Sequence, residues 1–150
     1  MSENGNRPVE ILLVEDNPTD VMMLRAALKQ SQVQNNLSVA GDGVEAIAFL
    51  RRQGVYADAP RPDLILLDLN MPKKDGREVL AEIKTDPDLM LIPVIVLTTS
   101  GSEEDILGSY ALHANSYVVK PISFARFVEM IQTLGKFWFQ TVTPPPKKQT

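Results

Sequence analysis

The residues best suited to chemistry come directly after short apolar runs of the sequence. These polar residues are Glu15, Asp16, Asp68, Asn70, Thr98, Thr99, Ser100 and Lys120. The runs before them are rich in branched side chains and show no polar–apolar alternation, which is typical of parallel strands covered on both faces. Because parallel strands deliver their carboxyl ends to one edge of a sheet, we expect carboxylates, hydroxyls and one ammonium to gather in a single crevice.

Carboxylates that share a crevice repel one another and lose solvation, and a hard divalent cation relieves both costs. Mg²⁺ fits this role because it prefers oxygen ligands, keeps several waters and accepts a phosphoryl oxygen. Asp68 follows the middle run and is placed as a carboxylate nucleophile that forms an aspartyl phosphate. The Lys120 ammonium and the Thr98 hydroxyl would then hold oxygens of the transferred group.

Each of these residues, taken singly, also has an ordinary structural explanation. An aspartate or asparagine after a strand commonly caps a helix or shapes a turn, and a lone lysine is commonly a solvated charge. The weakest run, Leu37–Ala40, leads only into Gly41-Asp42-Gly43, which offers no comparable chemistry. The other four strand ends carry complementary groups, and this combination favours one shared site.

The elements that must position these residues can also be predicted. The apolar runs Ile11–Val14, Leu37–Ala40, Leu64–Leu67, Val94–Leu97 and Tyr117–Val119 predict strands. Amphipathic patterns between them predict helices that begin near Pro18, Gly43, Gly76, Glu103 and Ser123, and Val44, Ile47 and Leu50 mark the second of these. Strand and helix alternate five times, so we expect an α/β fold, a doubly wound five-stranded parallel sheet in a three-layer sandwich. Residues Arg51–Pro62 are interpreted as a surface loop.

Composition narrows the classes of function. The 150-residue chain has a net charge of −4, no cysteine and one histidine. These values argue against a nucleic-acid binder, a disulfide or thiol site, a histidine metal cage and a Ser-His-Asp hydrolase. No apolar run approaches the ~20 residues of a membrane span, and no signal peptide is evident, so we expect a cytoplasmic protein. We expect tails at residues 1–8 and 141–150 around a domain at 9–140.

The strand-end motifs resemble the receiver domain of two-component response regulators. They are Ile11-Leu12-Leu13-Val14-Glu15-Asp16-Asn17, Asp68-Leu69-Asn70-Met71-Pro72, Val96-Leu97-Thr98 and Tyr117-Val118-Val119-Lys120-Pro121. The resemblance covers about Val9–Trp138 and implies the CheY-like, flavodoxin-like strand order 2-1-3-4-5. It further resembles the single-domain regulators that are partners of phytochrome-type histidine kinases.

The resemblance also implies a role for each motif residue. Asp68 would accept a phosphoryl group from a histidine kinase, with Lys120 and Thr98 as its catalytic neighbours. Mg²⁺ would be held by Asp16 and Asp68, by the backbone carbonyl of Asn70 and, through water, by Glu15. The Lys120-Pro121 bond would be cis. Two departures stand out: the acidic pair is Glu15-Asp16 rather than two aspartates, and Thr99 could crowd the route to Asp68 and slow phosphotransfer.

A switch and a dimer complete the expectation. Phosphorylation would draw Thr98 toward the phosphoryl group and let Tyr117 rotate inward, which would reshape the surface of the fourth helix, fifth strand and fifth helix. The last helix carries more large apolar groups than one sheet face can cover, so we expect a homodimer through Phe124, Phe137, Trp138 and Phe139. The downstream partner is unknown.

Three other functions are compatible with parts of the pattern. A degenerate receiver would act only by binding proteins, although the intact site residues weigh against it. A Mg²⁺-dependent phosphatase of the haloacid dehalogenase type needs a general acid two residues after its nucleophile, where this chain has Asn70. A flavin carrier would rest on fold analogy alone. We therefore expect a signalling phosphoacceptor rather than an enzyme.

Overall fold

A parallel sheet forms the centre of the molecule. The computed structural model describes residues 8–99, 101–120 and 123–134. Its strands are β1 (Val9–Val14), β2 (Asn35–Ala40), β3 (Leu64–Leu67), β4 (Val94–Thr98) and β5 (Ser116–Val119). They lie in the order β2-β1-β3-β4-β5, and each neighbouring pair is parallel. The predicted five-stranded sheet and its strand order are confirmed.

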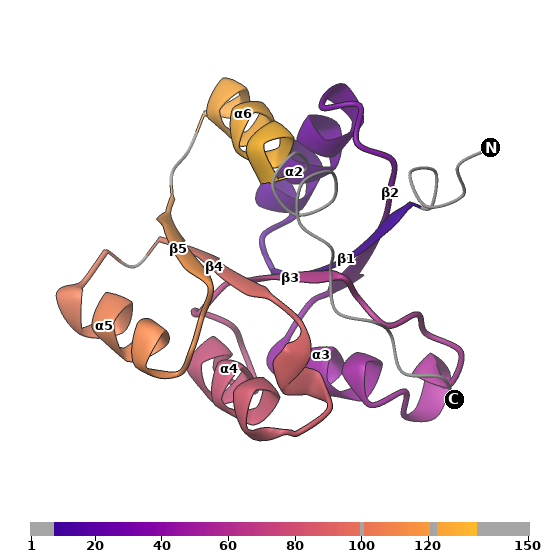
Figure 1. Ribbon diagram of the computed structural model, residues 1–150, viewed down its shortest axis with the longest axis vertical. Coiled ribbons are helices and arrows are strands. Elements are labelled where there is room, and N and C mark those ends of the chain that lie inside the picture. Colours follow the sequence, from indigo (N-terminus) through magenta and orange to yellow (C-terminus); the bar gives the residue numbers. More distant parts are fainter. Residues whose placement is uncertain (1–7, 100, 121–122, 135–150) are drawn as a thin grey trace.

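Helices cover both faces of this sheet. They are α2 (Pro18–Gln30), α3 (Gly43–Leu50), α4 (Gly76–Thr85), α5 (Glu103–Ala111) and α6 (Phe124–Leu134), with the short 3₁₀ turns η1 (Gly54–Tyr56) and η2 (Leu89–Leu91). Figure 1 shows α2 and α6 together on one face and α3, α4 and α5 on the other. This is the three-layer arrangement that the alternating pattern predicted.

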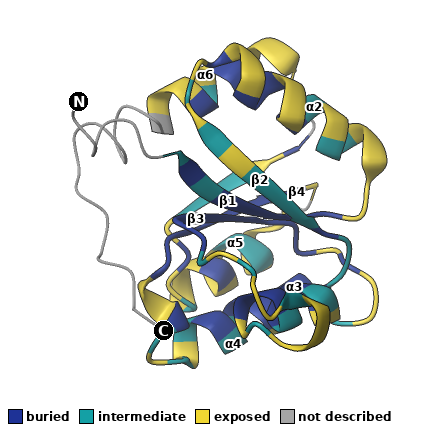
Figure 2. Ribbon diagram, turned by 90° about the vertical axis from the view of Figure 1, so that its right-hand side faces the viewer, coloured by how far each residue is buried: buried dark blue, intermediate teal, exposed yellow. Residues whose placement is uncertain are grey.

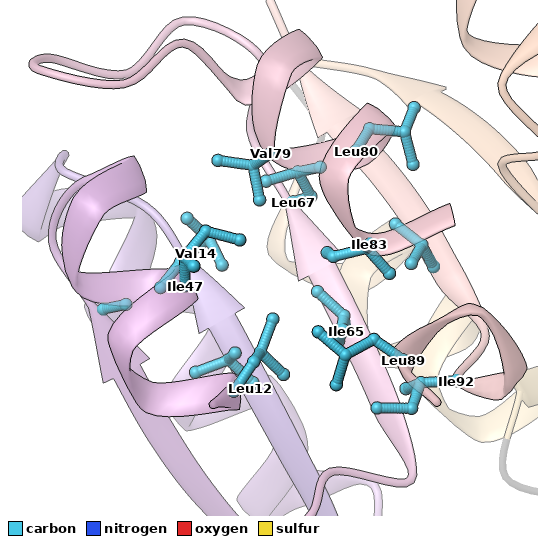
Figure 3. Close-up of a cluster of buried hydrophobic side chains, with 14 of the residues drawn as sticks. Leu12, Val14, Ile47, Ile65, Leu67, Val79, Leu80, Ile83, Leu89 and Ile92 are labelled. Atoms are coloured by element: carbon cyan, nitrogen blue, oxygen red, sulfur yellow. The ribbon is translucent and has the colours of Figure 1, made fainter. Parts of the chain in front are cut away.

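Alternate residues of the central strands fill two separate apolar clusters. Leu12 and Val14 of β1 join the cluster against α3 and α4, whereas Ile11 and Leu13 join the cluster against α2 and α6. Figure 3 shows the first cluster, where β1 and β3 meet side chains of α3, α4 and η2. Full burial of one such side chain contributes roughly 1.5–3 kcal/mol, so the two clusters hold the strand ends firmly in place.

The edge strands differ from the prediction that every run is covered on both faces. This holds for the central strands but is wrong for β5, where Tyr117 and Val118 are half-buried and Val119 is 43% exposed. Because β5 has a strand neighbour on one side only, its other side is not covered by another strand among the described residues. Figure 2 shows the opposite edge of the sheet, where β2 carries intermediate and exposed residues. The run was apolar enough to mark a strand, but apolarity alone did not distinguish edge from centre.

The helix starts follow the polar residues expected to cap them. Five helices have a capping side chain, from Asn17, Asp42, Asp75, Ser102 and Ser123. Asp75 also forms a capping box with Glu78. Of the three residues that marked α3, Ile47 and Leu50 are buried, whereas Val44 is exposed. An apolar residue in the first turn of a short helix can lie outside the face that packs against the sheet.

The Arg51–Pro62 segment is a surface loop with one internal anchor. It contains η1, and Tyr56 packs its ring against Phe49, with ring centroids 5.4 Å apart. Arg52 closes the segment by donating from Nε to the carbonyl of Ala59. No helix within the described ranges has the length and apolarity to cross a membrane. Apart from Pro8, the predicted tails lie outside the described residues, so they stay predictions.

Candidate functional site

The carboxyl ends of β1, β3, β4 and β5 bring four buried polar side chains into one crevice. Lys120 lies with its Nζ 2.7 Å from Glu15 Oε1 and 3.5 Å from Asp68 Oδ2. The Glu15 and Asp68 side chains are almost fully enclosed, and Thr98 beside them is completely buried. These residues are separated by up to 105 positions in the chain, yet the parallel strands deliver them to one place as predicted.

Backbone hydrogen bonds between strands fix the depth of each residue. The Asp68 amide donates to the carbonyl of Val14, and the Lys120 amide donates to the carbonyl of Thr98. Gly76, at the start of α4, lies so close behind Asp68 that a Cβ there would be 2.2 Å from the Asp68 carbonyl oxygen. The Asp68 backbone is therefore held by main chain on both sides.

Three carboxylates of the crevice form a cluster suited to a divalent cation. One oxygen each from Glu15, Asp16 and Asp68 lies within 4.8 Å of the others. Glu15 and Asp68 are buried, whereas Asp16 is exposed at the rim. Oxygen donors at this spacing match the preference of hard cations such as Mg²⁺ or Mn²⁺. Asn70, the fourth predicted ligand, follows two residues after Asp68 and is also exposed.

The electrostatics of the crevice reflect its crowding. Burial raises the pKa of Glu15 to about 7, with the Lys120 hydrogen bond lowering it and the Asp68 charge raising it further. Burial alone would lower the pKa of Lys120, but hydrogen bonds to Asp20 and Glu15 outweigh this and raise it above its ordinary value. The lysine is thus a cation at neutral pH, while burial and the nearby Asp68 charge make Glu15 easier to protonate than an ordinary glutamate.

Thr98 and Asn70 define the outer wall of the crevice. The Asn70 side-chain Nδ2 lies 3.4 Å from both Thr98 Oγ1 and Thr99 Oγ1, and its backbone amide donates to Asp68 Oδ1. Thr99 is exposed, so it stands at the mouth rather than inside. The side chain of Asn70 therefore connects the hydroxyl that ends β4 with the hydroxyl that follows it.

Comparison with known proteins adds an independent finding. The sequence model of one protein family, the response regulator receiver domain, matches residues 11–132 of this chain. The chain belongs to this family. The match includes β2 to β5, most of β1 and every strand-end residue described above.

Individual relatives cover nearly the whole receiver domain. The response regulator Rcp1 of Synechocystis sp. is 52% identical over 145 residues, which are 97% of this chain and 99% of that protein. The crystal structure of the Mn²⁺-bound form of Rcp1 has a TM-score of 0.84 and covers 93% of this chain and 100% of that one. The phosphorylated cyanobacterial phytochrome response regulator RcpA is 50% identical, with a TM-score of 0.86 and the same two coverages. The predicted resemblance to phytochrome response regulators is confirmed.

The predicted switch and dimer residues are placed only in part. Tyr117 of the receiver is half-buried and packs against the cluster beneath α3 and α4. Phe124, at the start of α6, is 39% exposed. Pro121, Phe137, Trp138 and Phe139 lie outside the described residues. The switch role of Tyr117, the cis bond and the dimer thus stay predictions.

Two contacts near the site were missed at the level of sequence. Asp20, in the first turn of α2, lies with Oδ2 2.8 Å from Lys120 Nζ. Arg77, which follows the start of α4, binds Asp105 of α5 through two hydrogen bonds of 2.8 and 2.6 Å. Both acids are in a first helical turn, where acids are common, so their position gave no distinguishing signal.

Proposed function

We propose that this receiver domain accepts a phosphoryl group on Asp68 from a histidine kinase of the phytochrome type, with Mg²⁺ bound beside it. The observation that carries the proposal is the environment of Asp68. Its buried carboxylate belongs to a cluster of three acids and lies 3.5 Å from the Lys120 ammonium, and the buried Thr98 ends the neighbouring strand. The similarity to RcpA, whose structure is phosphorylated, supports it.

The metal would be Mg²⁺, held by Asp16 and Asp68, by the Asn70 carbonyl and, through water, by Glu15. The cluster geometry fits a hard cation of this kind, and the Mn²⁺-bound form of Rcp1 shows that a close relative binds a divalent ion. When bound, the cation supplies positive charge that offsets the negative charge of the transferring group.

The chain's own residues then perform the transfer. An Asp68 carboxylate oxygen forms a bond to phosphorus while the bond from phosphorus to the kinase histidine nitrogen breaks, and the imidazole leaves with its electron pair. Lys120 donates a hydrogen bond to a phosphoryl oxygen, and Thr98 donates another from its hydroxyl. Their charge-assisted bonds stabilise the product because the crevice excludes most water.

The signal would leave through the surface formed by α5, β5 and α6. Thr98 is the last residue of β4 and pairs with Val119 of β5, so a movement of Thr98 reaches that strand directly. Tyr117, on the same strand, would follow by rotating inward. This is a two-state change whose balance the phosphoryl group shifts by its contacts with Thr98 and Lys120.

The same surface is our proposed dimer interface. Phe124 is exposed at the start of α6, where it can contact a second copy together with Phe137, Trp138 and Phe139. The net charge of −4 favours protein partners over nucleic acid. Sedimentation over a concentration series tests the dimer, and a 16.6 kDa species alone at high micromolar protein would contradict it.

The decisive experiment compares two aspartates at opposite ends of β3. A phytochrome-type histidine kinase carrying labelled phosphate is mixed with wild type, Asp68→Asn and Asp63→Asn in the presence of Mg²⁺. Asp63 is a matched control because it is 8% exposed against 7% for Asp68, and it precedes the strand that Asp68 follows. We expect label on wild type and on Asp63→Asn and none on Asp68→Asn. Equal labelling of all three would overturn the proposal.

This experiment also separates the alternatives. A degenerate receiver would leave all three proteins unlabelled while retaining partner binding. A phosphatase would release phosphate from a generic ester such as p-nitrophenyl phosphate, and Asn70 provides no general acid for that turnover.

A further inference from the structure

The Lys120 ammonium has three acidic partners, and the third comes from outside the predicted site. Its Nζ lies 2.7 Å from Glu15, 2.8 Å from Asp20 and 3.5 Å from Asp68. An ammonium has three N–H groups. Two of them form short hydrogen bonds with acids that do not receive the phosphoryl group, and the contact with Asp68 is at the outer limit of a hydrogen bond.

The three partners differ in how easily they are displaced. The Glu15 side chain is 2% exposed and the Asp68 side chain 8% exposed, whereas that of Asp20 is 24% exposed. Solvent weakens an ion pair because water competes for both partners. The bond to Asp20 is therefore the short contact that costs least to break.

The position of Asp20 is fixed by the start of α2. Asn17 caps this helix and accepts hydrogen bonds from the backbone amides of Thr19 and Asp20. Pro18 occupies the first turn and limits its backbone freedom. The carboxylate is thus presented to Lys120 from a rigid turn, and the contact does not depend on a loop.

We propose that Asp20 is a positioning residue that holds the Lys120 ammonium away from Asp68 until a phosphoryl group takes its place. The inference rests on the proposed phosphorylation of Asp68. A phosphoryl group carries a charge of about −1.5 to −2 at neutral pH and several strong acceptors, so it outcompetes a half-buried carboxylate for one N–H of the lysine. Asp20 would therefore lower the affinity of the site for phosphoryl groups by occupying the lysine and by adding negative charge.

The test uses beryllofluoride, a phosphoryl mimic that binds to an aspartate carboxylate. Wild type and Asp20→Asn are titrated with it at saturating Mg²⁺, and binding is followed by ¹⁹F NMR. We expect Asp20→Asn to bind about fivefold more tightly, which corresponds to about 1 kcal/mol. Asp20→Glu keeps the charge and should return to the wild-type affinity, whereas a merely structural role would not be rescued in this way.

Two controls separate the possible causes. Glu103→Gln removes one charge from the first turn of α5, where the side chain is exposed and outside the crevice, and should leave the affinity unchanged. Circular dichroism confirms that each variant folds. Unchanged or weaker binding by Asp20→Asn, beside a wild type that binds, would overturn this inference alone. A wild type that does not bind would overturn the proposed function and the inference with it.

Discussion

The two ends of β3 each carry a buried aspartate, and the two have opposite surroundings. Asp63, before the strand, accepts a hydrogen bond of 2.9 Å from the Glu10 backbone amide, and its own amide donates to the Glu10 carbonyl. Asp68, after the strand, lies among other acids and reaches the Lys120 ammonium only at 3.5 Å. The Asp63 carboxylate links β3 to β1, whereas the Asp68 carboxylate makes only a long contact with its cation.

This contrast shows that two equally buried aspartates at the ends of one strand can have very different electrostatic surroundings. Among the described contacts, the Glu10 backbone amide donates to Asp63 and to no other acid. The Asp63 carboxylate therefore stabilises the fold through this hydrogen bond. Asp68 shares its lysine with Glu15 and Asp20, so its charge is only partly compensated. Negative charge exceeds the available positive charge at the Asp68 end of the strand, which is the end that we propose to accept the phosphoryl group.

The largest effect should follow from removing the cation that the crowded end shares. Lys120→Met leaves Glu15, Asp20 and Asp68 without their common partner, so we expect a loss of about 3–5 kcal/mol in the free energy of unfolding without Mg²⁺. Urea denaturation measures it. The control is Lys84→Met, because Lys84 donates to the carbonyls of Met90 and Ile92 and compensates no acid there. An equal loss in both variants would contradict the argument from shared charge.

Metal binding by the acids around Asp68 should stabilise the folded protein. At a Mg²⁺ concentration 100 times the dissociation constant, we expect the wild type to gain about 2.7 kcal/mol in unfolding free energy. Asp16→Asn removes one member of the acidic cluster and should lose most of this gain. The measurement is thermal unfolding with Mg²⁺ and with EDTA. If Asp16→Asn gained as much as the wild type at equal Mg²⁺, the cluster would not be the metal site.

Asp63 should contribute to the stability of the fold and not to the binding of a phosphoryl group. Asp63→Ala leaves the Glu10 amide without its acceptor, and hydrogen bonds to charged groups contribute about 1.5–3 kcal/mol. We expect a loss in that range by chemical denaturation, with beryllofluoride binding retained. Loss of binding in a folded Asp63→Ala protein would mean that the two ends of β3 are coupled.

The smallest effect should have the opposite sign. Asp68→Asn removes one charge from a crowded acidic cluster, so we expect the unfolding free energy in EDTA to rise by up to about 1 kcal/mol while phosphorylation is lost. Differential scanning calorimetry detects such a change as a higher Tm. A clear decrease in Tm would show that Asp68 stabilises the fold as Asp63 does.

The residues at the strand ends could be predicted from the sequence because a strand fixes the edge of the sheet at which its last residue lies. Glu15, Asp68, Thr98 and Lys120 each follow an apolar run, and parallel pairing left them no other edge. Asp20 was not found because its contact depends on how α2 is oriented above the sheet, which no local pattern specifies. The link from Arg77 to Asp105 escaped for the same reason, since it joins two helices rather than two strands.

The exposure of β5 shows a second limit. Its residues are as apolar as those of β4, yet Val119 is open to solvent because the strand lies at the edge. Edge and centre differ by what lies beside the strand, and that information resides elsewhere in the chain. The family resemblance supplied the strand order and so compensated for this limit.

The glycine behind Asp68 constrains how this protein can evolve. At position 76 a methyl group would overlap the Asp68 carbonyl, and at position 43 it would lie 2.0 Å from the Lys74 carbonyl oxygen. A saturation library selected for signalling should therefore tolerate almost no codon but glycine at these two sites, whereas Gly108, with open space around it, should accept many. Mutational robustness would then be lowest at a residue that has no side chain at all.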